Sequence, residues 1–157
     1  MDTQFFGFES DFVDSMRCIP MAVRLRLDRT GVKLKLNEWS KFAPELRMAL
    51  AQSPCGSPAE REQWKSFVIS LVEQACGTAP SLLPEPVAEA WEDRGSVPEQ
   101  VSAQARSLGL AVDATAWAAL TPLQRFALVK LSRPGHENRN FRPAMEEFGL
   151  ISASPGE

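Results

Sequence analysis

Residues 57–77 read SPAEREQWKSFVISLVEQACG, and this stretch carries the strongest helix pattern of the chain. Ser57 and Glu60 form a capping box, with Pro58 at the first helical position. Gly77 stands where a left-handed residue would end the helix. The apolar side chains in between recur three and four residues apart, on one side of an α-helix: Trp64, Phe67, Val68, Leu71, Val72 and Ala75. The pattern predicts a long helix with one buried side.

Further start and stop signals predict more helices on either side of this one. A second capping box, Thr121 to Gln124, opens a predicted helix that runs to about Leu131. A third, Ser96 to Glu99, opens a helix that should stop near Gly109. The remaining signals are single residues: Asn37 and Asp113 as N-caps before Trp39 and Trp117, and Pro143 and Gly149 around a short C-terminal helix.

Few segments depart from helical patterns. Residues 32–36 alternate apolar and charged side chains, which suggests one short extended segment. Residues 78–86 contain three prolines and are expected to be a connector. Residues 85–93 are expected to form an acidic helix, in which Trp91 is the least constrained tryptophan, and residues 152–157 are expected to fray. The predicted fold class is all-α.

A shift of 78 positions aligns two parts of the sequence without a gap. Identical residues then coincide at eight pairs: Pro20 with Pro98, Val23 with Val101, Gly31 with Gly109, Trp39 with Trp117, Pro44 with Pro122, Arg47 with Arg125, Ala49 with Ala127 and Leu50 with Leu128. This predicts an internal duplication, because repeat units cover one another's apolar faces. We expect one compact helical domain over 1–151. Its units, about 19–77 and about 97–149, are joined by the linker 78–86 and related by a pseudo-twofold axis.

The composition is that of a globular protein, with 44% hydrophobic and 24% charged residues among 157. A formal net charge of −3 gives no overall attraction to nucleic acid or anionic lipid, so neither is an expected partner. No apolar run approaches the about 18 residues of a membrane span. Residues 1–4, MDTQ, do not resemble a signal peptide. The expected location is the cytoplasm.

The reactive side chains are few and scattered. His136 is the single histidine, and no pattern supplies it with a nucleophile and an orienting carboxylate. Together with Cys18, Cys55 and Cys76 it makes four potential zinc ligands, but no pair has the close C-x-x-C spacing of such sites. We expect reduced thiols, no cofactor and no enzymatic activity. Two alternatives stay open: a metal or iron–sulfur carrier using these four residues, and a small enzyme using His136 and Glu137.

Charge is distributed unevenly along the chain. Residues 17–47 hold eight Lys or Arg against three acids, and residues 125–142 hold five against one. Residues 59–100 hold eight acids against three bases. The basic stretches fall in equivalent parts of the proposed duplication. They are either solvated helix faces or a surface for an acidic partner.

Two segments near the ends of the chain resemble the signatures of a known family. Residues 6–21, FGFESDFVDSMRCIPM, resemble the opening signature of the nitrate reductase-associated protein family. Residues 131–138, LSRPGHEN, with Asn140-Phe141 and Pro143-Ala144, resemble its closing signature. Residues 31–55, with Trp39 and the Pro54-Cys55 pair, are similar as well. The resemblance extends over nearly the whole chain.

This resemblance implies an accessory protein that is encoded beside assimilatory nitrate reductase and needed for it. Nitrate reductase is itself a molybdenum-cofactor and iron–sulfur enzyme. The implied partner is nitrate reductase or its maturation machinery, and the role is maturation, stabilisation or docking of an electron donor. The signatures contain the candidate partner-binding residues Arg17, Cys18, Arg133, His136, Glu137 and Asn138. A structural role for these residues is the alternative.

Overall fold

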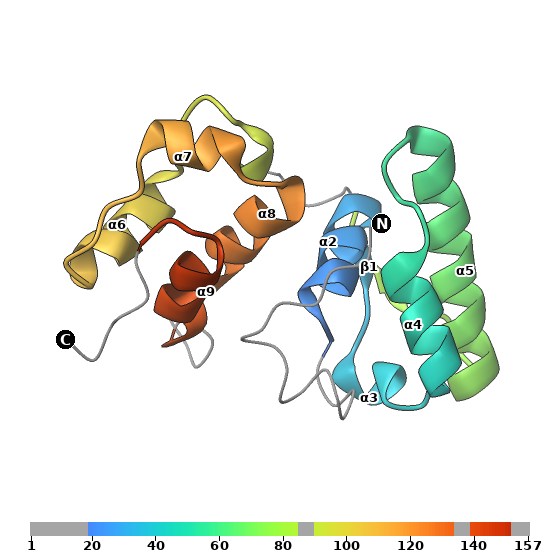
Figure 1. Cartoon of the computed structure of the whole chain (residues 1–157). Helices are drawn as coiled ribbons and strands as arrows, with labels where there is room; N and C mark the ends of the chain where they lie inside the picture. The colour runs from blue at the N-terminus through green and yellow to red at the C-terminus, as the bar shows by residue number, and fades with distance from the viewer. Residues whose placement is uncertain (1–18, 85–89, 134–138, 152–157) are drawn as a thin grey trace. The chain divides into compact units, whose positions relative to one another are not determined.

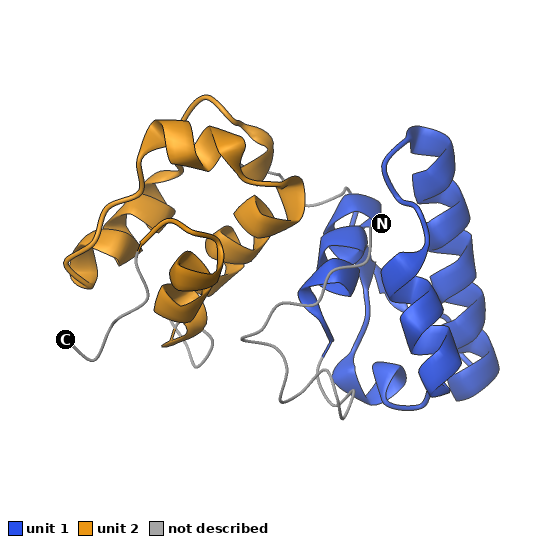
Figure 2. Cartoon of the chain, viewed as in Figure 1, with its two compact units in different colours: residues 1–5, 9–88 blue, residues 6–8, 89–157 orange. Residues whose placement is uncertain are grey.

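The computed structural model of the chain describes residues 19–84, 90–133 and 139–151. They form two compact units, which divide between residues 84 and 90 (Figure 2). Both units are mostly helical. The expected single domain over 1–151 and its pseudo-twofold axis stay predictions.

The described residues of the first unit form four helices and two short strands, which Figure 1 traces. In chain order they are α2 (Met21–Thr30), β1 (Val32–Lys33), α3 (Leu36–Trp39), α4 (Pro44–Gln52), α5 (Pro58–Cys76) and β2 (Ser81–Leu82). Helix α2 packs against α4 and α5, and α3 packs against α5. The fully buried side chains of Trp39, Leu50 and Val68 lie in the core of this unit.

Helix α5 begins and ends where the sequence predicts. The backbone N–H of Glu60 donates to Ser57 Oγ (3.1 Å), and that of Ser57 donates to Glu60 Oε1 (3.0 Å), so the capping box is confirmed. Gly77 ends the helix in the left-handed conformation, with φ 79°. The buried side is narrower than predicted: Trp64, Val68, Leu71 and Val72 are buried, but Phe67 is half-buried and Ala75 is exposed.

The small antiparallel sheet corrects the prediction of an all-α fold. Strand β1 lies in the predicted extended segment, and it pairs with β2, which lies in the stretch expected to be a plain connector. Val32 is opposite Leu82, and the N–H of Leu83 donates to the oxygen of Gly31 (2.7 Å). Pro80 and Pro84 flank β2, and a proline has no N–H to donate, which keeps this strand short.

The described part of the second unit contains the 3₁₀ turn η2 and four helices. They are η2 (Ala90–Glu92), α6 (Glu99–Ser107), α7 (Ala114–Ala119), α8 (Pro122–Leu131) and α9 (Phe141–Glu147). Helix α8 packs against η2, α6 and α9. Helix α8 is buried on nearly all sides. The core of this unit also contains the side chains of Trp91, Trp117 and Phe141.

Trp91 is a core residue, contrary to prediction. Its side chain is 2% exposed, and its ring meets the ring of Phe126 edge-on at 5.8 Å. The expected acidic helix is represented by η2 alone, since residues 85–89 lie outside the described part of the chain. The helix stops at Asp93, whose carboxylate accepts from the N–H of Gly95 (2.8 Å) and from Ser96 Oγ (3.0 Å). A local turn of this kind competes with helical hydrogen bonds.

Of the predicted N-caps other than Ser57, two are confirmed and two are wrong. The side chains of Thr121 and Asp113 cap α8 and α7. Asn37, however, lies inside α3, which begins one residue earlier after Lys35. Ser96 bonds to Asp93, and α6 begins after Pro98 instead. In both cases a neighbouring carboxylate makes the local hydrogen bond instead. Glu38 accepts from the N–H of Lys35 (2.8 Å), and Asp93 accepts from the hydroxyl of Ser96.

Three helices in each unit begin at the same spacing. Helices α2 and α6 begin at residues 21 and 99, α3 and α7 at 36 and 114, and α4 and α8 at 44 and 122. Each pair of starts is 78 residues apart, the shift that aligns the sequence. Gly31 and Gly109 are both left-handed, with φ 76° and 74°, and Trp39 and Trp117 are both fully buried.

Candidate functional site

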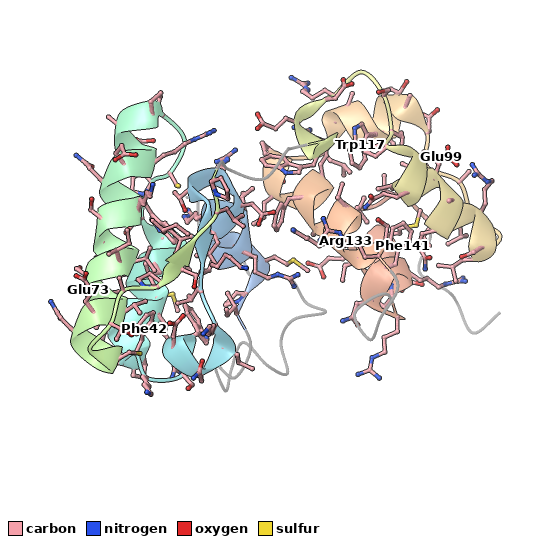
Figure 3. All side chains as sticks on the ribbon, turned by 180° about the vertical axis from the view of Figure 1, so that it is seen from behind. Phe42, Glu73, Glu99, Trp117, Arg133 and Phe141 are labelled. Carbon is pink, nitrogen blue, oxygen red and sulfur yellow. The ribbon has the colours of Figure 1, made fainter. Side chains whose placement is uncertain are left out.

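The turn between α8 and α9 holds the one candidate partner-binding residue that lies in the described part of the chain. This residue is Arg133, whose side chain is exposed just after α8 (Figure 3). The other candidates, Arg17, Cys18, His136, Glu137 and Asn138, lie outside the described residues. The site is therefore built from Arg133 and its described neighbours.

The end of α8 is held in place by a partly buried polar contact with α6. Gln100 Nε2 donates to the oxygen of Val129 (2.9 Å) and is 2.8 Å from Ser132 Oγ. Ser132 Oγ in turn donates to the oxygen of Val129 (2.7 Å). These bonds satisfy polar groups at the C-terminus of α8, where carbonyls lack helical partners. They fix the backbone immediately before Arg133.

The start of α9 is held by apolar contacts. The side chains of Phe141, Ala144 and Met145 are fully buried, and α9 packs against α8. Figure 3 labels Phe141, the first residue of α9, and Arg133, which follows α8. Asn140 precedes α9, and its side chain makes no capping bond. Packed helices on both sides thus position the residues that flank the turn.

Four basic residues lie on either side of this turn, and we call them the basic corner: Lys130, Arg133, Arg139 and Arg142. The three arginines are exposed. Lys130 is half-buried, with its Nζ 5.2 Å from the centre of the Phe126 ring. Arg142 Nε is 3.5 Å from a carboxylate oxygen of Glu146, one helical turn further on. Among the described residues, no acidic side chain forms an ion pair with Arg133 or Arg139.

The basic corner has the chemistry of a binding surface. A guanidinium group offers several N–H donors in one plane and binds carboxylates in a bidentate manner. The arrangement suits the recognition of an acidic surface.

Two arginines of the basic stretches are buried and donate to main-chain oxygens, so not every basic residue of these stretches is available to a partner. Arg125 is 4% exposed, and it donates from Nε to the oxygen of Trp91 (2.7 Å) and from a terminal nitrogen to that of Leu120. Burial lowers the pKa of its guanidinium, the charge of Arg94 adds to this effect, and Glu92 opposes it. In the first unit, the buried Arg26 donates to the oxygens of Ser53 and Ala22, at 2.8 Å each.

The two described cysteines cannot share a metal ion. Cys55 precedes α5 and Cys76 ends it, and a helix of 19 residues is roughly 28 Å long. Sulfur ligands of one zinc ion lie within about 4 Å of one another. No cluster of three or more potential ligands occurs among the residues that the structure describes, and Cys18 and His136 lie outside them.

Cys55 is a buried thiol surrounded by cations. Burial raises its pKa, while Arg26, Arg29 and Arg61 act in the opposite direction. Arg29 also donates to the oxygen of Cys55 (3.3 Å). The group therefore keeps its proton under ordinary conditions and behaves as a small apolar side chain.

Taken together, these features define a small, mostly helical protein of two compact units with an exposed basic corner. The chain belongs to the nitrate reductase-associated protein family: the model of this family, described as "Conserved nitrate reductase-associated protein", matches residues 5–148. Both signature segments lie within that range. No curated protein and no solved structure matches the chain.

None of the described helices is long and apolar enough to cross a membrane.

Proposed function

We propose that this chain is a non-catalytic accessory protein that binds assimilatory nitrate reductase or its maturation machinery. By binding, it supports the maturation, stability or activity of the enzyme in the cytoplasm. The observation that carries this proposal is family membership over residues 5–148. The name of the family states an association with nitrate reductase and gives no reaction of its own.

The basic corner supports a binding role. Arg133 and Arg139 are exposed, and neither forms an ion pair with a described acidic residue, so their contribution to folding is small. Arginines of this kind bind carboxylates of a partner in charge-assisted pairs. Arg133 also belongs to the closing signature, together with His136, Glu137 and Asn138. We propose that these residues contact the partner.

The test is deletion of the gene, followed by complementation in cells that grow on nitrate. Nitrate reductase activity and the amount of the enzyme are measured separately, which distinguishes a loss of active enzyme from a loss of expression. We expect activity per enzyme molecule, or the amount of enzyme, to fall on deletion and to return with the wild-type chain. Purified protein should also bind purified nitrate reductase or one of its maturation proteins. Unchanged activity in the deletion strain would refute the proposal.

We further propose that the two units descend from a duplicated ancestor. The common spacing of 78 residues between three pairs of helix starts supports this origin, as do the matched glycines at 31 and 109. Two unrelated segments would have no reason to share this spacing. We also propose that the two units together form one domain over residues 1–151.

A further inference from the structure

The outer face of α3, together with the strand that leads into it, forms a second exposed surface. Leu36, Asn37, Ser40 and Lys41 are exposed, whereas Glu38, Trp39 and Phe42 are buried. This alternation places the exposed residues on one side of a helical turn. Lys33 and Lys35 precede them, exposed and two residues apart in an extended segment. We call these six residues the α3 surface: Lys33, Lys35, Leu36, Asn37, Ser40 and Lys41.

The α3 surface combines positive charge with an apolar side chain. Leu36 is 52% exposed, the largest exposure of a large hydrophobic residue in the described part of the chain. Between residues 31 and 43 the exposed charged side chains are three lysines. The one acid in this range, Glu38, is buried and accepts from the N–H of Lys35 (2.8 Å), so it serves the start of α3. The lysines therefore carry a local positive charge.

The second unit indicates that the fold does not require these side chains. Its helix α7 begins 78 residues after α3 and also buries a tryptophan, Trp117. The positions equivalent to the α3 surface are Ala111, Asp113, Ala114, Thr115, Ala118 and Ala119. None of them is a lysine or a leucine. The same short helix thus forms with small residues on its outer face, so the leucine and the lysines of α3 are not needed for folding.

We infer that the α3 surface is a docking site for an acidic segment of a partner protein, one that carries an apolar side chain to cover Leu36. This inference rests on the proposed function, since it takes nitrate reductase as the partner. An apolar anchor with a charged, partly hydrated surround is the usual arrangement of a protein interface. Lysines at the edge of such an interface speed association with an acidic surface and select against basic ones.

Charge argues against two other occupants. A second copy of this chain, docked through the same surface about a twofold axis, would set lysines against lysines. A membrane surface requires a larger apolar face or a denser basic cluster than one leucine and three lysines provide. An acidic protein segment that carries an apolar side chain complements the lysines and also covers Leu36.

The test replaces three residues of the α3 surface with those that the second unit has at the equivalent positions: Lys33→Ala, Leu36→Ala and Lys41→Ala in the full chain. A matched control changes the net charge equally and also removes one exposed leucine: Gln63→Glu and Gln74→Glu on α5, with Leu108→Ala after α6. Melting temperatures of both variants are measured first. Their affinities for purified nitrate reductase then follow, at low and at high salt.

We expect the α3 variant to fold normally and to bind nitrate reductase about tenfold more weakly or worse, as loss of an anchor residue commonly does. The control should stay within about twofold of wild type, since substitutions outside an interface leave its contacts intact. Leu36→Met should bind as wild type, because it keeps an apolar side chain of similar volume. The affinity of the wild type should fall with salt more steeply than that of the α3 variant.

Other results would overturn the inference in distinguishable ways. If the α3 variant binds nitrate reductase as tightly as wild type does, the inference is wrong and the proposed function stands. If the wild type does not bind nitrate reductase, both the inference and the proposed function fail for this partner. If the substitutions abolish sedimentation with vesicles of anionic phospholipid, or convert a dimer into monomers, and leave enzyme binding unchanged, the surface binds lipid or a second copy.

Discussion

Arg125 Nε donates a hydrogen bond to the main-chain oxygen of Trp91 over 2.7 Å, between two buried residues that lie 34 positions apart. A second nitrogen of the same guanidinium donates to the oxygen of Leu120. One side chain thus ties η2 and the end of α7 to α8. The equivalent residue of the first unit, Arg47, donates to the oxygens of Trp39 (3.2 Å) and Ser40 (2.7 Å). In both units an arginine donates to carbonyl oxygens at the C-terminal end of the short helix before it.

Replacing Arg125 with alanine is expected to lower the free energy of unfolding by about 2 to 4 kcal/mol, because two buried carbonyl oxygens lose their donor. Chemical denaturation followed by circular dichroism measures this change. Arg106→Ala is the control, since Arg106 forms an exposed ion pair with Glu99 (2.7 Å). Its effect should stay below about 1 kcal/mol. Equal effects of the two substitutions would show that the buried bonds are not important for stability.

The buried thiol of Cys55 should make stability depend on alkaline pH. Burial raises its pKa from the ordinary value of 9.0, so the unfolded thiol ionises first as pH rises. The unfolded state then binds fewer protons than the folded state, and the free energy of unfolding falls. Cys55→Ala should reduce this loss between about pH 8 and about pH 10, where thiols titrate. Denaturation series of the two proteins over this range measure the difference, and parallel curves would contradict the prediction.

The same burial predicts a difference in thiol reactivity. In a Cys18→Ser background, the half-buried Cys76 should react with an aromatic disulfide reagent at least about tenfold faster than Cys55, since exposure and thiolate fraction set the rate. Mass spectrometry of partly labelled protein identifies the modified residue. Denaturant should remove the difference. Faster reaction at Cys55 would mean that the loop before α5 opens readily.

Glu60 should contribute to stability at neutral pH and lose this contribution in acid. Backbone N–H groups of Ser57 and Gly56 lower the pKa of its carboxyl below the ordinary value of 4.5. A lowered pKa stabilises the folded state above the unfolded pKa, and the contribution disappears as pH falls through the folded pKa. Glu60→Gln should therefore lower the melting temperature at neutral pH, with a difference from wild type that shrinks below 4.5. A difference that is independent of pH would refute this role.

Arg133→Ala and Arg133→Ala/Arg139→Ala test whether the basic corner contacts the partner. An exposed arginine without a described ion pair adds about 0–1 kcal/mol to folding, so the melting temperature should change by no more than about 4 °C. A docking arginine is worth about 2 kcal/mol, so nitrate reductase activity in the cells should fall at least severalfold. Arg106→Ala is again the matched control. A large loss of melting temperature, with activity that follows only the amount of folded protein, would show a structural role instead.

The proposed duplication predicts that the backbones of residues 19–50 and 97–128 superpose. Trp39 and Trp117 should then occupy matching environments, as should Arg47 and Arg125. The superposition of Cα atoms measures this directly. Different backbone paths of the two segments would contradict the duplication, whatever the similarity of their helix bounds.

The candidate site was only partly predictable. The closing signature contains Arg133, whereas Lys130, Arg139 and Arg142 stand out in the sequence only as members of a basic stretch. That stretch could not be divided into surface and core. Arg125 belongs to it and is buried, because its partners are main-chain oxygens, which any residue supplies. Charge along a sequence therefore does not reveal which arginines are available to a partner.

The sequence by itself determined the helices whose signals lie within a turn of their ends. The capping boxes at Ser57 and Thr121 and the left-handed glycines at 31, 77 and 109 are local, because a cap bonds to a backbone group about three residues away. The spacing of 78 residues was likewise evident from residue types alone and recurs in the helix starts.

Only the tertiary structure decided which distant segments meet. Strand β2 forms because its residues 81–82 find β1 across the whole of α4 and α5. Trp91 is buried because Phe126 and the donor of Arg125 lie against it from α8. Neither segment carries a local signal, since strand pairing and burial are stabilised by contacts with remote residues. Local hydrogen bonds determine where a helix begins, and long-range packing determines what it covers.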